Sequence, residues 1–454
     1  MHAEKRSWRF GVLSFTGTGH LNPLIALAQE LKSRGHKVTF FERAKIAERI
    51  LDAGLDFFPL SFPRHTLQEP PPCDRPGIVN EIASLRFNLK RVSQDLEHYL
   101  AETPPALLNA GVDALFVNEI ALTGPTVAQL LGLPYFLIST SVPHHLGWKS
   151  SSWLTGYRYS ATAASWLQGL LLEVSVLRVR GPIRTLLDRF RRKAGLGPAR
   201  LIGREYPCVA HLTQLPECLG LERGSTAGNL YSTGPWLDGK ARPDAEFPWN
   251  KLDGRPIAYV TMGTTRNAQP AILRMIAEAC RDLDLQLVIS LGNRFDPEHF
   301  ADLPGRPLVV KFAPQLELLK IASIAITHGG PNTAFETLME GKPTVAIPLA
   351  YDQPAIAWRL KRLKAAEVLP VMRLSAVRIR RAVIKVLSDP KYREAAERIQ
   401  ASMQSTQGAK RAADLIEVGL SGYSAEQQIS IPPKRFIDHK QPQDAAAAAS
   451  YLRN

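Results

Sequence analysis

The chain is poor in the features that mark several classes of protein. Its 454 residues include four scattered cysteines, with no Cys-x-x-Cys pair and no histidine at zinc-ligand spacing. This pattern favours reduced, buried thiols in a cytoplasmic protein over a disulfide framework or a structural zinc site. No apolar run approaches the roughly 18–20 residues of a membrane span, and glycines break the short run near the N-terminus. The sequence therefore predicts neither a transmembrane segment nor a signal peptide.

Acidic residues are also scarce relative to basic ones, 42 against 56, which gives a formal net charge of +14. Such an excess indicates a polyanionic partner, namely nucleic acid, an acidic membrane or a phosphorylated small molecule. No recognition helix, RNA-binding motif or zinc finger supports nucleic acid. Two partners remain: a phosphorylated small molecule, and an anionic membrane surface that would meet the basic segments Leu177–Lys193 and Arg359–Lys385.

Hydrophobic periodicity predicts alternating strands and helices in two similar halves, and therefore parallel sheets with right-handed crossovers. The predicted strands are Arg9–Phe15, Lys37–Phe41, Leu55–Pro59, Ala114–Val117, Tyr135–Ile138, Ile257–Met262, Gln286–Ser290, Leu308–Lys311, Ile324–Thr327 and Thr344–Ile347. A Gly/Pro-rich, aperiodic stretch separates the halves. We expect an N-terminal domain over 1–238, a linker over 239–255, a C-terminal domain over 256–420 and a loosely ordered tail over 421–454.

The first candidate site is the loop Thr16–His20, which follows the first predicted strand. It resembles a dinucleotide fingerprint, but Asn22 stands where the third glycine is required and no Walker lysine follows. His20 lies beyond the carboxyl end of a strand, where ligands bind in such sheets. An imidazole with its ordinary pKa is suited to deprotonating a hydroxyl, although packing near a helix start is an alternative role.

The second candidate site is the segment 311–358, in which a predicted strand runs into His328-Gly329-Gly330-Pro331 and a helix begins. Small residues at a helix N-terminus expose backbone N–H groups, and such groups bind a diphosphate. Glu336, one turn further, could accept both hydroxyls of a ribose. Phe312 is placed to stack on a base, and Asp352-Gln353 supply groups for sugar hydroxyls.

Together these motifs resemble the UDP-sugar-dependent glycosyltransferases of plant secondary products, macrolides and carotenoids. The similarity lies in F-A-P-Q, T-H-G-G-P-N-T-x-x-E and P-L-A-x-D-Q, in G-T-G-H-L-N-P-L, and in Val260–Thr264. It implies a GT-B fold, two Rossmann-like doubly wound α/β domains facing each other across a cleft. His20 would be the base that activates the acceptor. The donor-binding residues implied are Thr264, Phe312, Gln315, His328, Gly330, Asn332, Thr333, Glu336, Asp352 and Gln353.

One position departs from the family pattern. Relatives usually place an aspartate after the fourth apolar strand to orient the catalytic histidine, whereas this chain has Asn118 followed by Glu119. An asparagine can fix an imidazole tautomer but cannot stabilise an imidazolium by charge. Either Glu119 takes over the role, or activity is low, or His20 acts with weaker assistance.

The resemblance implies an inverting transfer of a hexose, with glucose expected, from a UDP-sugar co-substrate to a hydroxyl group, without a cofactor or metal. The one Asp-x-Asp, at Asp282 and Asp284, is predicted to lie on the wrong side of the sheet for a metal site in the cleft. Apolar, aromatic N-terminal segments indicate a hydrophobic acceptor, with a carotenoid as one candidate and peripheral attachment to the inner membrane face as its corollary. The alternatives are a soluble polyketide, flavonoid or sterol acceptor, a non-catalytic GT-B protein that binds a nucleotide sugar or lipid, and an epimerase.

Overall fold

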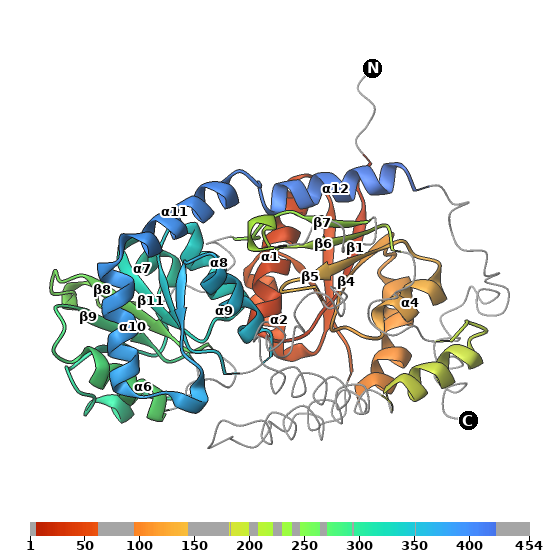
Figure 1. Ribbon diagram of the computed structural model, residues 1–454. Coiled ribbons are helices and arrows are strands. Elements are labelled where there is room, and N and C mark those ends of the chain that lie inside the picture. Colours follow the sequence, from red (N-terminus) through yellow and green to blue (C-terminus); the bar gives the residue numbers. More distant parts are fainter. Residues whose placement is uncertain are drawn as a thin grey trace.

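The computed structural model describes residues 6–61, 95–143, 181, 183–198, 208–220, 229–237, 246–263, 270–292, 295–349 and 351–423. Within these residues the chain forms two parallel sheets, each flanked by helices, that lie side by side (Figure 1). This arrangement confirms the predicted two-domain α/β architecture.

The first sheet has seven strands in the described part of the chain, in the order β3-β2-β1-β4-β5-β6-β7. They are β1 (Arg9–Leu13), β2 (Lys37–Glu42), β3 (Asp56–Pro59), β4 (Ala114–Asn118), β5 (Tyr135–Ser139), β6 (Ala210–Thr213) and β7 (Leu230–Ser232). The strand order reverses between β1 and β4, so the carboxyl ends of these two strands form the topological switch point of the sheet.

The second sheet repeats this plan with six strands among the described residues, in the order β10-β9-β8-β11-β12-β13. They are β8 (Ile257–Thr261), β9 (Gln286–Ser290), β10 (Leu308–Val310), β11 (Ala322–Thr327), β12 (Thr344–Ala346) and β13 (Ala366–Val368). Its switch point lies between β8 and β11, which pair in parallel.

The helices that cover the sheets include α1 (Thr18–Ser33), α2 (Ala47–Asp52) and α4 (Gly124–Leu131) in the first domain. The second domain has α6 (Pro270–Cys280), α7 (Gln315–Ile321), α8 (Pro331–Met339), α9 (Gln353–Arg362), α10 (Ala376–Ser388) and α11 (Pro390–Gln404). Residues 95–109 and 183–193 are also helical.

Both faces of the first sheet are buried, because successive strand residues enter different cores. Phe40 packs beneath α1 and α2, whereas its neighbour Phe41 packs in the core on the opposite face. A parallel sheet covered on both sides is expected to have such continuous apolar strands. This double coverage fixes the carboxyl edge of the sheet, where the candidate residues lie.

The last described helix, α12 (Ala409–Ser421), follows the second domain in sequence but packs on the first sheet. Its apolar face, Ala412, Ala413, Ile416 and Leu420, joins the core beneath α1, and Figure 1 shows α11 and α12 running from one domain to the other. The predicted boundary at 420 assigned this segment to the second domain by sequence order alone. The division at 239–255 stays a prediction.

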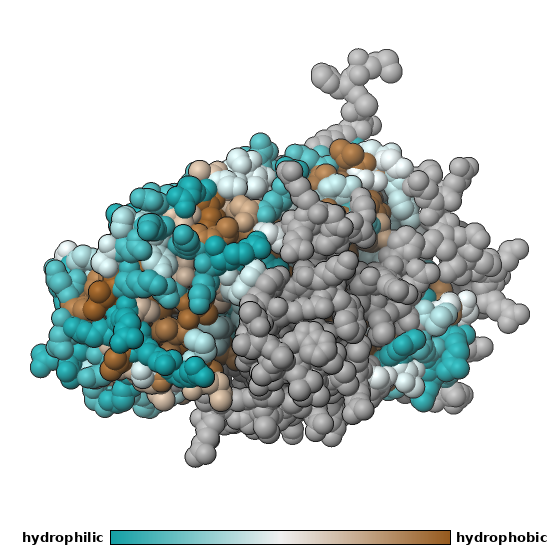
Figure 2. Space-filling view, viewed as in Figure 1, coloured by the Kyte–Doolittle hydropathy of each residue, from teal (hydrophilic) through white to brown (hydrophobic). Residues whose placement is uncertain are grey.

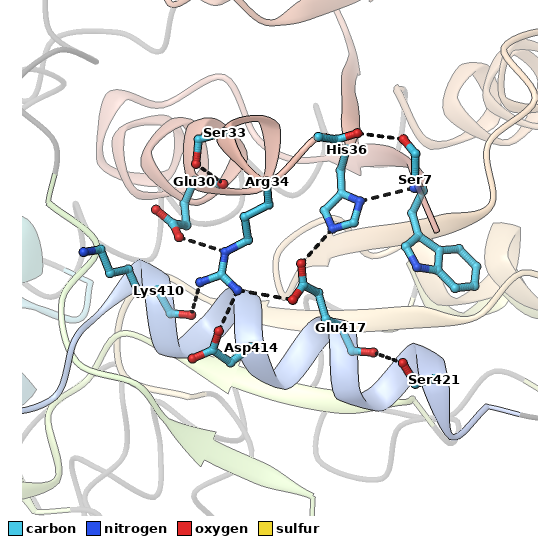
Figure 3. A network of polar contacts seen from close by, with 11 residues as sticks. Ser7, Glu30, Ser33, Arg34, His36, Lys410, Asp414, Glu417 and Ser421 are labelled. Atoms are coloured by element: carbon cyan, nitrogen blue, oxygen red, sulfur yellow. Dashed lines mark hydrogen bonds and ion pairs between the residues drawn. The ribbon is translucent and has the colours of Figure 1, made fainter. Parts of the chain in front are cut away.

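A polar network fastens α12 to the first domain (Figure 3). Arg34, just after α1, donates to Asp414 at 2.6 Å and to Glu417 at 3.3 Å. His36 Nδ1 accepts the backbone N–H of Trp8, and His36 Nε2 lies 3.0 Å from Oε1 of Glu417. Because Nδ1 accepts a hydrogen bond, the Nε2 proton points to the carboxylate. This last described helix thus ties the two domains together at the side opposite the carboxyl ends of the strands.

No helix of the described residues is long and apolar enough to cross a membrane. On the face shown in Figure 2, the described surface is largely hydrophilic, with apolar residues in small groups. Two basic residues of the segments predicted to meet a membrane lie inside the protein. Arg191 is 1% exposed and donates to Thr126 and Gln129, and Arg359 is 2% exposed. The remaining exposed basic residues of 183–193 are Arg184, Arg189, Arg192 and Lys193.

Candidate active site at the two switch points

His20 lies in the first turn of α1, which begins at Thr18, inside the predicted loop Thr16–His20. Gly17 is the N-cap residue and adopts an extended backbone, so the chain enters the helix directly from the end of β1. The histidine is half-buried beside Phe15, whose ring stands edge-on to the imidazole at a centroid distance of 5.9 Å and is 43% exposed. An apolar ring therefore lies beside the candidate base.

Asn118, the last residue of β4, lies across the switch point from His20, as predicted. Its Oδ1 accepts the Ile120 N–H at 3.1 Å, which fixes the orientation of the amide and leaves Nδ2 facing His20 Nδ1 at 3.5 Å. Glu119 is 8% exposed, and its Oε1 lies 3.4 Å from Nε2 of His211 on β6. His211 Nε2 is also 2.6 Å from Ser139 Oγ.

The shortest contact of His20 Nδ1 among those described is with a residue that the sequence analysis did not identify. Thr140, directly after β5, places its Oγ1 2.7 Å from this nitrogen and is 3% exposed. The only signal in the sequence was a run of hydroxyl residues, Ser139–Ser141, after a predicted strand.

At the switch point of the second sheet, β11 runs directly into the predicted donor residues His328 and Gly330. Gly329 adopts a positive φ of 78°, and Gly330 is the N-cap residue of α8, which has no side-chain cap and no acidic residue in its first turn. The N–H groups of the first turn are therefore suited to an anion. A Cβ on Gly330 would come within 2.4 Å of His328 Nε2, so only glycine fits beside this ring.

His328 is neutral at physiological pH. Burial lowers the pKa of its imidazole to about 4, against the opposing effect of a hydrogen bond with the Thr261 backbone. The neutral imidazole would therefore not supply a positive charge to a diphosphate.

The structure brings two further candidate donor residues into contact. Gln315, the first residue of α7, donates from Nε2 to Glu336 Oε2 and accepts the Tyr259 hydroxyl at 3.0 Å. Glu336 is 1% exposed on α8. Phe312 is 43% exposed, as a ring that stacks on a base needs to be. Gln315, three residues after Phe312, thus orients the Glu336 carboxylate.

Asp352 and Gln353 lie at the start of α9, after Tyr351, a non-glycine residue with a φ of 58°. Asp352 Oδ2 accepts the hydroxyl of Ser141 from the first domain. Burial raises the pKa of Asp352, and the Ser141 hydrogen bond opposes this rise. The Oε1 atom of Gln353 accepts a hydrogen bond from the backbone N–H of Leu349 at 2.9 Å.

The two switch points face each other and are in contact. Asn332, in the first turn of α8, donates from Nδ2 to the Gly19 carbonyl at 2.7 Å. Its Oδ1 accepts from Gln214 Nε2 at 2.8 Å, and Gln214 follows β6 of the first sheet. The candidate base and the candidate anion site therefore adjoin across the domain boundary. Thr264, the remaining predicted donor residue, lies outside the described residues.

Within the described ranges, no group of three or more His, Cys, Asp and Glu side chains could hold a metal ion. Asp282 and Asp284 lie in the turn between α6 and β9, at the amino edge of the sheet and away from the switch point. Asp282 is 66% exposed and lies 3.4 Å from Arg281.

This arrangement defines a two-domain glycosyltransferase of the GT-B fold. Residues 12–140 match the N-terminal domain of glycosyltransferase family 28, and residues 274–417 match the C-terminal domain of erythromycin biosynthesis protein CIII-like proteins. The chain is 27% identical to the NDP-glycosyltransferase YjiC of Bacillus licheniformis, covering 90% of this chain and 97% of that relative. It is 24% identical to the zeaxanthin glucosyltransferase of Pantoea ananas, covering 88% and 93%.

Among solved structures, the glycosyltransferase of kitacinnamycin superposes with a TM-score of 0.69 at 24% identity, covering 91% of this chain and 99% of that one. The chain belongs to the UDP-glycosyltransferase superfamily. Its activity is accordingly the transfer of a sugar from a nucleotide sugar to a small-molecule acceptor.

Proposed function

We propose that this protein transfers glucose from UDP-glucose to a hydroxyl group of a hydrophobic small molecule, with inversion at the anomeric carbon and without a metal ion. The observation that carries the proposal is the contact between the His20 turn and the N-terminus of α8, made by Asn332 and Gly19. It brings a base and an anion site to one place, and glycosyl transfer by direct displacement requires both.

The chemistry follows from this placement. His20 Nε2 takes the proton of the acceptor hydroxyl, whose oxygen forms a bond to the anomeric carbon. The bond from that carbon to the diphosphate oxygen breaks, and its electron pair leaves with UDP. The first N–H groups of α8, with the neutral His328 beside them, would donate to the diphosphate as its charge increases, and preorganised donors of this kind stabilise a transition state.

The donor would be held by the second domain. We assign Phe312 and Gln315 to the base, Glu336 to the ribose, Thr264, Gly330, Asn332 and Thr333 to the diphosphate, and Asp352 with Gln353 to the sugar. The assignment of Asp352 is supported by the hydroxyl of Ser141, which this carboxylate accepts. The names of the relatives in the comparison leave the nucleotide open, since one is an NDP-glycosyltransferase.

A carotenoid is one acceptor that the proposal includes, since a zeaxanthin glucosyltransferase is among the similar proteins. The exposed Phe15 ring beside His20 offers an apolar contact for such a molecule. The similarity of the C-terminal half to erythromycin biosynthesis proteins favours a polyketide as the second candidate. The apolar segments that suggested a hydrophobic acceptor, 61–100 and 139–177, lie mostly outside the described residues.

The test is to incubate the full chain with UDP-glucose and a panel of carotenoid, polyketide, flavonoid and sterol acceptors, and to detect the mass gain of one hexose. We expect a product with a hydrophobic hydroxylated acceptor and unchanged turnover in the presence of EDTA. UDP-glucose binding without product or UDP release would instead indicate a binding protein, and activity lost with EDTA would contradict the metal-free mechanism.

Peripheral attachment to the inner membrane face belongs to the same proposal. Arg184, Arg189, Arg192 and Lys193 are exposed on one helix, and exposed basic residues attract anionic lipid. We expect co-sedimentation with phosphatidylglycerol vesicles at low salt and weaker co-sedimentation after Arg189→Glu and Arg192→Glu. Vesicles of phosphatidylcholine alone serve as the control, and equal binding to both kinds of vesicle, or none to either, would contradict the attachment.

A further inference from the structure

We infer that Thr140 is the residue that positions the catalytic base, by accepting a hydrogen bond from the Nδ1–H of His20. This inference rests on the proposed function and assigns to a neutral hydroxyl the role that a carboxylate has in the family pattern. It concerns how His20 is kept in the state that can accept a proton.

The requirement follows from the chemistry of imidazole. A neutral histidine holds its proton on one ring nitrogen and offers a lone pair on the other. For Nε2 to accept the proton of the acceptor hydroxyl, the ring proton must reside on Nδ1. A hydrogen-bond acceptor beside Nδ1 favours that tautomer, and a wrong tautomer in an analogous His–Asp pair costs about 10⁴-fold in kcat.

Asn118 cannot meet this requirement in the orientation observed. Its Oδ1 already accepts the Ile120 N–H at 3.1 Å, so the group that faces His20 Nδ1 at 3.5 Å is the NH₂. An amide NH₂ donates hydrogen bonds and does not accept them. Asn118 therefore favours the tautomer with its proton on Nε2, which is the unproductive one.

Thr140 can meet the requirement. Its Oγ1 lies 2.7 Å from Nδ1, a distance typical of a strong hydrogen bond and 0.8 Å shorter than the Asn118 contact (3.5 − 2.7 Å). A hydroxyl oxygen can accept the Nδ1 proton in both the neutral ring and the imidazolium. Because Thr140 is 3% exposed, water does not readily replace it.

The position of Thr140 is itself fixed. Gln214, which is fully buried, donates from Nε2 to the Thr140 carbonyl and to Asn332 Oδ1. The Gln214 Oε1 lies 3.4 Å from the Trp236 backbone nitrogen, which donates to it. Gln214 therefore links Thr140, directly after β5, to Asn332 on α8 of the other domain. The Thr140 hydroxyl is directed at His20.

The test compares Thr140→Val, which removes the hydroxyl at nearly constant shape, with Thr140→Ser, which keeps it. We expect kcat to fall about 10–100-fold in Thr140→Val and to stay within about threefold in Thr140→Ser, with the donor KM little changed in both. The acidic limb of the pH–rate profile should move to lower pH in Thr140→Val, because the imidazolium loses an acceptor.

Thr344→Val is the matched control. Thr344 is a fully buried threonine on β12 whose hydroxyl has no hydrogen-bond partner among the described residues, so the same substitution there should leave kcat unchanged. A second variant adds a rescue: Asn118→Asp keeps an acceptor for the Ile120 N–H and turns a carboxylate oxygen towards Nδ1. In the Thr140→Val background it should restore kcat to at least the wild-type level.

A readout without turnover separates this inference from the proposed function. In protein labelled with ¹⁵N-histidine, the ring nitrogen shifts of His20, assigned by their loss in His20→Gln, should show the proton on Nδ1 in the wild type and on Nε2 in Thr140→Val. An unchanged tautomer, or unchanged kcat in an active Thr140→Val enzyme, would overturn the role of Thr140. Failure of the wild type to transfer sugar to any acceptor would contradict the proposed function while leaving the tautomer measurement valid.

Discussion

Replacing His20 by glutamine is expected to lower kcat about 10²–10⁴-fold, the range for loss of a general base. Glutamine retains a hydrogen-bonding side chain of similar reach but cannot take a proton from the acceptor hydroxyl. The donor KM should change little, because the proposed donor contacts come from α7, α8 and α9 of the other domain. Initial rates at saturating donor and acceptor measure the loss, and calorimetric titration with UDP checks that the donor site is intact.

His299→Gln provides the control for this substitution, since His299 is exposed in the short 3₁₀ helix Pro297–Phe300 of the second domain. We expect full activity in that variant. A His20→Gln enzyme that keeps more than about half of the wild-type kcat would remove His20 from the mechanism, because a general base contributes at least about 10²-fold.

The sequence was sufficient for the fold wherever a strand is long and apolar. Gln286–Ser290 was predicted with the observed bounds, since five consecutive buried residues lie between a helix and a glycine. The missed strands β6, β7 and β13 have only three or four residues, with polar members such as His211, Tyr231 and Glu367. In such short segments the pairing with neighbouring strands, rather than hydrophobic pattern, decides the structure.

The attachment of α12 could not be predicted for a related reason. Its pattern indicates an amphipathic helix, but the same apolar stripe fits either sheet. What selects the first sheet is a set of contacts between residues almost 400 positions apart, above all Arg34 with Asp414 and Glu417. Hydrophobic periodicity contains no information about such partners.

The set of candidate donor residues was evident from the sequence, because all but Thr264 follow one another in a single segment, from Phe312 to Gln353. The environment of His20 was not, because it is assembled from separate strand ends: Thr140 lies 120 positions from His20. The sequence directed attention to Asn118 and Glu119. The structure places Asn118 beside the ring with its donor group inward, and Glu119 beside His211.

The second large effect is expected at Glu336, whose carboxylate would bind the ribose hydroxyls of the donor. Replacement by glutamine exchanges an acceptor-only, charged group for one that presents an NH₂, and hydrogen bonds to charged groups contribute about 1.5–3 kcal/mol each. Two such bonds predict a rise of about 10²-fold or more in the UDP-glucose KM. The change in kcat should be smaller, since the ribose is remote from the bond that breaks.

The ribose of the donor nucleotide allows a more specific test of this role of Glu336. A donor that lacks the ribose 2′-hydroxyl, such as dTDP-glucose, loses one of the two bonds, so the wild type should prefer UDP-glucose and Glu336→Gln should largely lose this preference. Glu340→Gln, one turn beyond Glu336 at the C-terminal end of α8, is the matched control and should keep the preference. Equal preference in the wild type and Glu336→Gln would show that the carboxylate does not bind the ribose. Because Gln315 holds Glu336 Oε2, Gln315→Ala should weaken the same preference in part, by releasing the carboxylate from the orientation in which it faces the donor.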